Sequence, residues 1–542
     1  MSEVSPSAKV IIYNYKDRGG DKPPSPLLSV HEIDVSEDVV AINTQKSKSE
    51  PSGSFMIQLA PTHNWVNVIT PNSWLVIAIS RNPIEELNYK TIKMIGRVDT
   101  IRTQSSIDQT GTVRTSYMVA GRDWGQIFEG YVNIDPAFVG QSTGLAAIFK
   151  MSFGIELKDF NSKKFSTNTD ELMNFCLNLF NLGGNERELS SRGFSVQGGA
   201  LFNSSGFEIP YKLASVIGNN YGTSMASLIK LKTGVLTGED KYKEEVESLG
   251  ILNVQALLGY NTLWSIINAH ANLTINEVFT ELSEESGTLT PTLYKRVKPF
   301  YLKKEGELIP PPFLTIPGNI KSEFINLKSY PINSTDIITI DLGTNGRDIV
   351  NFIELSVSVS TSITDKYQAP LDSLIKGNNT TFQLSDQISI ARDGLRPLKL
   401  TTSFFPPNVL TNNVDYTRTK QWLPVLRNWY FNTHMMFNGT VSIIGMNEYI
   451  PVGSNIRIQY RPLFNGVRIN SSSDTFITAH VESVSHRFLV ERDGTNKFLT
   501  TITFSRGIST TLDEKDNSSF GIDIAMDRGL VSEFEGKNTF RQ

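Results

Sequence analysis

Two short stretches of the sequence, "GRVDTI" at residues 96–101 and "AHVESV" at residues 479–484, have nearly the same pattern of residues. Each places an acid directly after a valine, Asp99 after Val98 and Glu482 after Val481, within an alternation of apolar and polar residues. Such alternation is typical of a β-strand with one buried face. The two valines lie 383 residues apart (481 − 98), which raises the question of whether the chain carries one β-unit twice.

The sequences around the two stretches agree in order and in spacing. Upstream, "ITPNSWLVIAI" at 69–79 aligns with "IPVGSNIRIQY" at 450–460, each a turn followed by an outgoing strand. Downstream, twelve residues separate the acid from a glycine in both copies (111 − 99 and 494 − 482), and each copy ends at an arginine. The markers are Val98, Gly111 and Arg122 in the first copy and Val481, Gly494 and Arg506 in the second. We infer an internal duplication.

The pattern between the two copies is helical rather than strand-like. In "TNTDELMNFCLNLFNLGG" (167–184) and "NTLWSIINAHANL" (261–273), apolar residues recur at the three- and four-residue spacing of one helix face. The sequence therefore predicts a mainly β fold with a helical middle, an α+β architecture with two β-barrels. We expect a first barrel at 1–140, a helix-rich middle with an extended connector at 141–330, a second barrel at 331–510 with a loop-rich insertion near 355–420, and a polar C-terminal tail at 511–542.

Composition excludes several classes of function. The net charge is −4 with no dense run of Lys and Arg, which argues against gripping nucleic acid through its phosphates as the main activity. No apolar run approaches the roughly 18 residues of a membrane span, and no signal peptide is visible. The one cysteine, Cys176, excludes an internal disulfide framework and is expected to be structural. We expect no cofactor and no metal, because no nucleotide-binding or HExxH motif occurs.

Several residues could nevertheless carry a site. Asp99 and Glu482 could form the carboxylate pair of a glycoside hydrolase, but as equivalent positions in two separate units they are expected to lie too far apart. His480 and His486 lie six residues apart, too far for a pair of metal ligands on one strand. Among the large apolar residues, Trp74 is expected in the core, whereas Trp124 and Phe128 are candidates for a subunit interface.

A duplicated unit also suggests an assembly. Closed homo-oligomers repeat each surface by symmetry, so a trimer whose chains carry two like barrels presents six similar units around a ring. Such a ring can join a six-fold partner to a three-fold one. The apolar strands at 74–79 and 456–460 are expected to line the packing between barrels or subunits.

An ordered set of stretches points to a family. The set comprises "KSKSEPSGSFMIQLAP", "ITPNSWLVIAI", "MIGRVDTI", "YMVAGRDWGQIFE", "NEVFTELSEESGTLTPTLYKRVKPF", "NGTVSIIG", "IPVGSNI", "AHVESVSHRF" and "TITFSRG". Together they resemble baseplate central hub proteins of contractile-tailed bacteriophages, a family related to the hub regions of type VI secretion spikes. The resemblance covers most of the chain except 141–250 and 355–420.

The resemblance implies a structural protein of the virion tail baseplate, without enzymatic activity, that is present in the host cytoplasm during assembly. It implies a homotrimer with two barrels per chain, a pseudo-six-fold ring between the hexameric tail tube and the trimeric spike, and contacts to surrounding baseplate proteins. DNA would pass only transiently through the lumen, and no stable membrane binding is implied. Asp99 and Glu482 would then face the lumen or a neighbouring subunit, where acidic charge repels passing DNA.

Two other classes of function remain open from the sequence. A cell-wall hydrolase needs two carboxylates, or a nucleophile and a base, that converge in a cleft. A host-surface adhesin would also be β-rich and trimeric, but it usually carries fibrous repeats or an exposed aromatic cluster for sugars. Murein hydrolysis and cell binding are the measurements that separate these classes from a structural hub.

Overall fold

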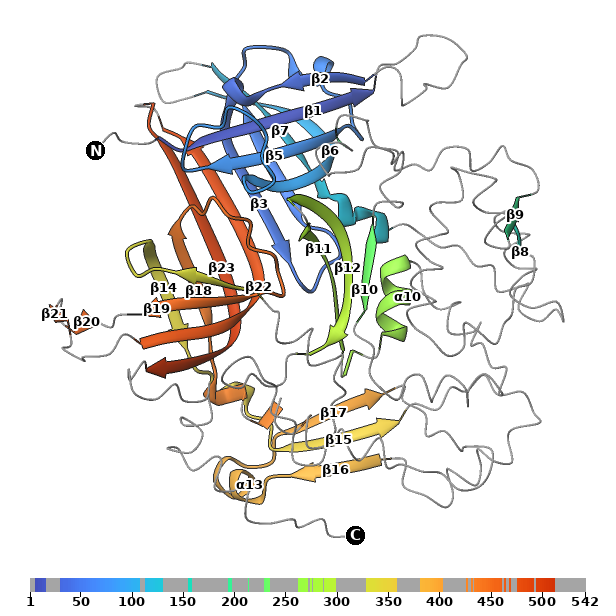
Figure 1. Ribbon diagram of the computed structural model, residues 1–542, viewed down its shortest axis with the longest axis vertical. Coiled ribbons are helices and arrows are strands. Elements are labelled where there is room, and N and C mark those ends of the chain that lie inside the picture. The colour runs from blue at the N-terminus through green and yellow to red at the C-terminus, as the bar shows by residue number, and fades with distance from the viewer. Residues whose placement is uncertain are drawn as a thin grey trace.

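The computed structural model describes the two β-rich ends of the chain and parts of the middle. The described residues are 5–15, 30–107, 113–129, 155–157, 194–196, 213, 229–233, 262–271, 273–274, 276–285, 287–298, 328–357, 381–402, 426, 430–431, 433–460, 463–464, 467–468, 475–491 and 494–511. Most of these residues are in strands, as Figure 1 shows, so the prediction of a mainly β fold is confirmed.

The N-terminal half forms one curled set of antiparallel strands. Its order in the sheet is β3-β4-β7-β6-β5-β1-β2. The strands are β1 (Ser7–Tyr15), β2 (Val30–Asp34), β3 (Val39–Ser47), β4 (Ser54–Leu59), β5 (Trp74–Ser80), β6 (Ile92–Ile107) and β7 (Val113–Asp123). All seven residues of β5 are buried, as its unbroken apolar sequence predicts. Trp74 at its start is 1% exposed, which confirms it as a core residue.

The C-terminal half repeats this order. Its strands run β14-β18-β23-β22-β19-β13 in the sheet. They are β13 (Ser329–Ile332), β14 (Ile337–Gly343), β18 (Phe437–Ile444), β19 (Asn455–Tyr460), β22 (Thr475–Val490) and β23 (Asn496–Thr511). Strand by strand, β14, β18, β23, β22, β19 and β13 correspond to β3, β4, β7, β6, β5 and β1. The last pair differs in direction, because β13 is parallel to β19 whereas β1 is antiparallel to β5.

The two halves join edge to edge into a single 13-stranded sheet. The joint is an antiparallel pairing of β3 with β22, from Ser47 opposite Ser483 to Ala41 opposite Leu489. In Figure 1 the strands of the two halves lie side by side across this joint. Each half encloses an apolar core of its own, and Phe488 and Phe498 of the C-terminal half pack into the core of the N-terminal half.

The middle of the chain adds a small sheet and a helix. Helix α10 (Leu263–His270) begins at a capping box made by Thr262 and Ser265, and it confirms the helix predicted around 261–273. Beside it lies a sheet of order β10-β12-β11, built from β10 (Lys230–Thr233), β11 (Asn276–Glu285) and β12 (Thr288–Val297). Two short strands, β8 (Ile155–Leu157) and β9 (Phe194–Val196), pair farther away.

A helix-rich middle is therefore not confirmed, because most described elements between residues 141 and 330 are strands. The other predicted helix, at 167–184, lies outside the described residues, as do Cys176, the connector at 309–317 and the tail beyond Thr511. No helix among the described residues is long and apolar enough to cross a membrane.

The segment near 355–420 was predicted to be mostly loop, and this is wrong for the part that the structure describes. β15 (Phe352–Val357) pairs with β16 (Thr381–Ser385) on one side and with β17 (Pro397–Thr402) on the other. Between β16 and β17, α13 (Gln387–Asp393) is capped by the Asp386 carboxylate, which accepts from two backbone N–H groups. The polar composition suggested a loop, but among the described residues of this segment Asp386 acts as a helix cap and Thr381, Thr401 and Thr402 are strand residues.

Candidate functional site

The two halves share an unusual turn directly before the strands β5 and β19. Asn72 and Gly453 both have positive φ, 68° and 75°. The Asn72 N–H donates to the Val98 carbonyl at 2.7 Å, and the Gly453 N–H donates to the Val481 carbonyl at 2.9 Å. In return, the Val98 N–H donates to the Ser73 carbonyl and the Val481 N–H donates to the Ser454 carbonyl, each at 2.9 Å. The aligned stretches at 69–79 and 450–460 therefore adopt the same local conformation.

The acids that follow the two valines lie at β-bulges. The pairing of β6 with β7 shifts between Val98 and Thr100, so Asp99 is the extra residue of that strand. The pairing of β22 with β23 shifts in the same way between Val481 and Ser483, where Glu482 is the extra residue. A bulge re-aims a side chain and is a specific feature rather than a general property of strands. Its recurrence at the same place supports the equivalence of the two halves.

The markers farther along need one correction. By the register of the ladders, Val98 lies opposite Gly121 and Val481 lies opposite Phe504, so Arg122 corresponds to Ser505. Arg506, which the sequence paired with Arg122, lies one residue later and has a positive φ of 56°. Gly494 lies in the turn between β22 and β23 with φ 81°, whereas Gly111 lies outside the described residues.

Each bulged acid is bound by a residue of the adjacent strand that lies opposite the residue two positions before the acid. Arg122 Nε donates to the Asp99 carboxylate at 2.8 Å, and Ser505 Oγ donates to the Glu482 carboxylate at 2.5 Å. Arg122 also pairs with Glu129. Both acids are about one third exposed at the side chain, 29% for Asp99 and 33% for Glu482. Each acid is paired with a cation, Arg122 for Asp99 and Lys48 for Glu482, and each of these cations also binds a second carboxylate.

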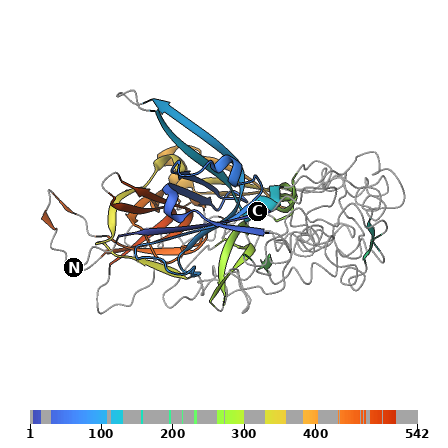
Figure 2. The same cartoon turned by 90° about the horizontal axis from the view of Figure 1, so that it is seen from above.

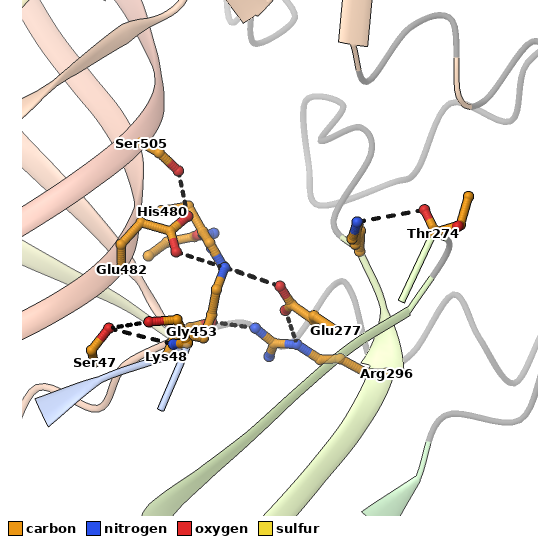
Figure 3. A network of polar contacts seen from close by, with 12 residues as sticks. Ser47, Lys48, Thr274, Glu277, Arg296, Gly453, His480, Glu482 and Ser505 are labelled. Atoms are coloured by element: carbon orange, nitrogen blue, oxygen red, sulfur yellow. Dashed lines mark hydrogen bonds and ion pairs between the residues drawn. The ribbon is translucent and has the colours of Figure 1, made fainter. Parts of the chain in front are cut away.

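Glu482 belongs to a larger buried network where three parts of the chain meet (Figure 3). Lys48, just after β3, places Nζ 3.0 Å from Glu482 on β22 and 3.1 Å from Glu277 on β11. Arg296 on β12 binds Glu277 at 2.6 Å and also donates to the Gly453 carbonyl. The network therefore ties the N-terminal half, the C-terminal half and the β11–β12 hairpin together at one point.

Burial and charge together set the ionisation of this network. Burial alone would raise the pKa of Glu277, but Arg296, Lys48 and His480 hold it well below its usual range. Burial would likewise raise the pKa of Glu482, but Lys48, His480 and Ser505 lower it. The pKa of His480 is lowered by burial and by Lys48. The carboxylates are thus ionised and the histidine is neutral near pH 7.

A second buried set lies beside the first and links the same three parts. Lys46 on β3 donates to Asp123 at 2.7 Å and to Thr280 of β11 at 2.8 Å. Glu281, the next residue of β11, accepts from the Val452 N–H at 2.6 Å and from the Tyr449 hydroxyl. Burial raises the pKa of Glu281 to about 7. The hairpin β11–β12 thus makes buried polar contacts with both halves at once. It is called the clasp hairpin below.

Trp124 and Phe128 were expected at a subunit interface, and the structure places them elsewhere. They are 2% and 0% exposed, in the 3-10 helix η2 (Trp124–Glu129) after β7. Their rings meet edge to face at 6.3 Å, and Phe128 meets Trp264 of α10 at 6.2 Å. They join the first half to the middle within one chain, because a ring already packed on its own chain is not available to a partner.

The remaining candidates also have structural partners. His480 faces Asn455 and Glu277, and His486 faces Thr500, so both histidines are packed within the sheet. The described structure does not bring Asp99 and Glu482 together as a carboxylate pair, since each is bound by the separate partners given above. Among the described residues, no group of three or more His, Cys, Asp or Glu side chains could hold a metal ion.

The role of the clasp hairpin is hard to predict from its sequence. Its "NEVFTELSEESG" alternates as a half-exposed strand does, yet Glu277 and Glu281 are 6% and 2% exposed. A polar residue in such a pattern is expected to face solvent. The burial becomes favourable through Arg296 of the same hairpin and through the distant cations Lys46 and Lys48.

Comparison with known proteins finds similarity in solved structures only. No protein-family model matches the chain, and no curated protein sequence matches it. A tail protein from Neisseria meningitidis is 11% identical, with 92% of this chain and 96% of that chain covered and a TM-score of 0.39. The 43 kDa tail protein of prophage MuSo2 from Shewanella oneidensis is 10% identical, covering 92% and 98%, with a TM-score of 0.38. The Francisella PdpA-VgrG complex is 7% identical over 92% of this chain and 58% of that one, with a TM-score of 0.38. Two of these solved structures are tail proteins, and the family that the sequence resembles is also one of phage tails.

Proposed function

We propose that this chain is a non-enzymatic structural hub of a contractile tail baseplate. In this proposal three copies form a ring that presents six similar units, joins a six-fold tail tube to a three-fold spike, and leaves a lumen for DNA. The class of machine follows from the sequence resemblance. The proposed mechanism follows from the fold, in which the β3–β22 pairing joins two equivalent halves side by side.

One observation carries the proposal. The six strands of the C-terminal half follow the same order in the sheet as six strands of the N-terminal half, and β3–β22 joins the halves side by side. Two like units joined edge to edge by unlike edges form a head-to-tail contact, and repetition of such a contact generates a ring if the rotation closes. Each chain then contributes two of the positions of a ring with an even number of units.

The clasp hairpin supports the same mechanism. An adapter must keep the angle between its two units constant under load. Lys48 binds carboxylates of both other parts in a buried setting, where breaking a pair is strongly destabilising. Lys46 reaches Thr280 of the clasp hairpin, and Arg296 of the hairpin reaches the Gly453 carbonyl of the C-terminal half. The network thus fixes the relative position of the halves.

The test is the mass of the purified protein in solution, measured by light scattering after size-exclusion chromatography and by native mass spectrometry. The proposal predicts a species of three times the 60.4 kDa chain mass, alone or after addition of a candidate spike protein. A hexameric tube protein should then bind one such trimer. A chain that stays at 60.4 kDa under all these conditions would overturn the proposal, and release of soluble murein fragments by the pure protein would favour the hydrolase alternative instead.

A further inference from the structure

The joint inside the chain leaves a matching pair of open edges. Along residues 483–489, β22 is occupied on both sides, by β23 and by β3. The equivalent part of β6, residues 100–106 at the constant offset of 383, pairs with β7 alone among the described strands. Figure 2 shows the β6–β7 hairpin projecting from the body of the molecule. Residues 102–105 of this segment are exposed.

The second open edge is on β14, the strand that corresponds to β3. The equivalence can be followed across the ladders: Ile42, Ile57 and Val119 lie in line in the first half, and Ile340, Val441 and Ile502 lie in line in the second. β3 has β4 on one side and β22 on the other, whereas β14 ends the sheet with β18 as its one described neighbour. Ile338 on this edge is 55% exposed, which is high for an isoleucine in a strand.

We propose that β14 of one copy pairs with residues 100–106 of β6 in the next copy, in the antiparallel register that β3 and β22 use within the chain. The partner is a second copy of this chain, because the occupant of the equivalent edge is the chain's own β3. The inference rests on the proposed assembly of several copies and specifies its joint. The same strand-to-strand contact then occurs at every position of the ring, alternately within and between chains.

The register follows from the joint already formed. Within the chain, Ile42 lies opposite Phe488 and Asn43 lies opposite Arg487. Transferred to the open edges, Ile340 lies opposite Ser105 and Asp341 lies opposite Gln104 of the neighbouring copy. The faces are consistent with this register: Asp341 and Gln104 are exposed within one copy, whereas Ile340 is half-buried against the core of its own half.

The decisive test is a disulfide between the two predicted neighbours. Residues directly opposite across an antiparallel ladder are close enough for a disulfide. Asp341→Cys with Gln104→Cys, in a Cys176→Ser background, is expected to give covalent dimers and trimers on a non-reducing gel after mild oxidation. The matched control is Asn43→Cys with Arg487→Cys in the same background, which should oxidise within one chain and leave the monomer band. Either single cysteine variant should give covalent dimers at most.

A charge series provides a second readout without oxidation. Gln104→Glu places a carboxylate opposite Asp341, and Gln104→Lys places a cation there at the same exposed position. Cross-strand charge pairs change pairing by an amount that corresponds to roughly two- to fivefold in the dissociation constant of each joint. We expect Gln104→Glu to weaken assembly and Gln104→Lys to strengthen it, and Asp341→Lys should reverse the order of the two.

The outcomes separate the joint from the proposed function. Trimers by mass that give no covalent trimer, while the Asn43 and Arg487 control oxidises, would overturn this joint and leave the hub proposal standing. Equal effects of Gln104→Glu and Gln104→Lys would count against the register. A chain that is monomeric by mass in every variant would overturn the hub proposal and the joint together.

Discussion

Lys93 of β6 donates from Nζ to the backbone carbonyl of Asn447 at 2.9 Å, across the contact between the two halves. It donates also to the Glu448 carbonyl at 3.1 Å, and its side chain lies over the Phe498 ring. The residue is 3% exposed, so a cation is buried here against carbonyls rather than against a carboxylate. Burial lowers the pKa of Lys93 to about 7, and the same charge contributes to lowering the pKa of His486.

This buried lysine predicts that the protein gains stability as the pH rises above neutral. Between the folded pKa of about 7 and the usual value of 10.5, the unfolded chain binds the proton and the folded chain does not, so unfolding becomes less favourable with increasing pH. From pH 7 to pH 9 we expect a gain of about 1 to 2 kcal/mol from this group. Urea midpoints at the two pH values measure it. Lys93→Met should remove most of the gain, and an equal gain in that variant would contradict the assignment.

Removal of Lys48 is expected to destabilise the joint strongly. Lys48→Met leaves Glu277 and Glu482 with less compensating charge in a buried setting, and loss of one partner of a buried pair costs about 3 kcal/mol. Lys399→Met is the matched control, because Lys399 is 79% exposed and its pair with Glu354 contributes under about 1 kcal/mol. Thermal unfolding of both variants gives the comparison. Similar losses would show that the network does not hold the halves together.

Glu281 predicts an opposite pH dependence below neutral. Its folded pKa is raised to about 7 from 4.5, so its contribution to stability is complete below pH 4.5 and is lost as the pH rises to 7. The side chain of the Glu281→Gln variant cannot ionise. We therefore expect the wild-type protein to lose melting temperature relative to this variant when the pH is raised from 5 to 7. A difference that stays constant over this range would show that Glu281 ionises at its ordinary pKa.

The turn at Gly453 should tolerate a side chain poorly. A Cβ at this position falls 2.5 Å from Cζ of Phe279 on the clasp hairpin, and φ is 75°. Gly453→Ala therefore combines backbone strain with a clash and should cost about 2 to 4 kcal/mol. Gly494→Ala has a similar φ of 81° but meets nothing within 4 Å, so strain alone should cost about 1 kcal/mol. Chemical denaturation of the two variants separates the clash from the strain, and equal costs would place Phe279 elsewhere.

The sequence predicted the strands and turns whose conformation depends on residues close together in the chain. The alternation around Val98 and Val481, and the spacing to the turns at Asn72 and Gly453, reflect strand and turn geometry that each segment adopts by itself. The pairing of Arg122 with Arg506 failed by one residue, because the ladders keep a constant offset of 383 that places Ser505, and not Arg506, at the position of Arg122.

The features that the sequence did not predict depend on contacts between distant segments. The joint pairs Ser47 with Ser483, and nothing in either strand specifies the other. The burial of Glu277 depends on Lys48, which lies far away in the sequence. Trp124 and Phe128 were named as candidates for a subunit interface, because the packing of Phe128 against Trp264 of α10 could not be predicted from local pattern.

The β3–β22 joint has a consequence for synthesis on the ribosome. β3 ends at Ser47 and its partner β22 begins at Thr475, so at 5–20 residues per second the nascent chain carries an unfilled strand edge for roughly 20 to 90 seconds. That edge bears Asn43, Gln45 and Lys46, and polar and lysine side chains on an edge discourage pairing with other chains. The same lysine that later binds Asp123 can thus protect the half-finished protein from aggregation.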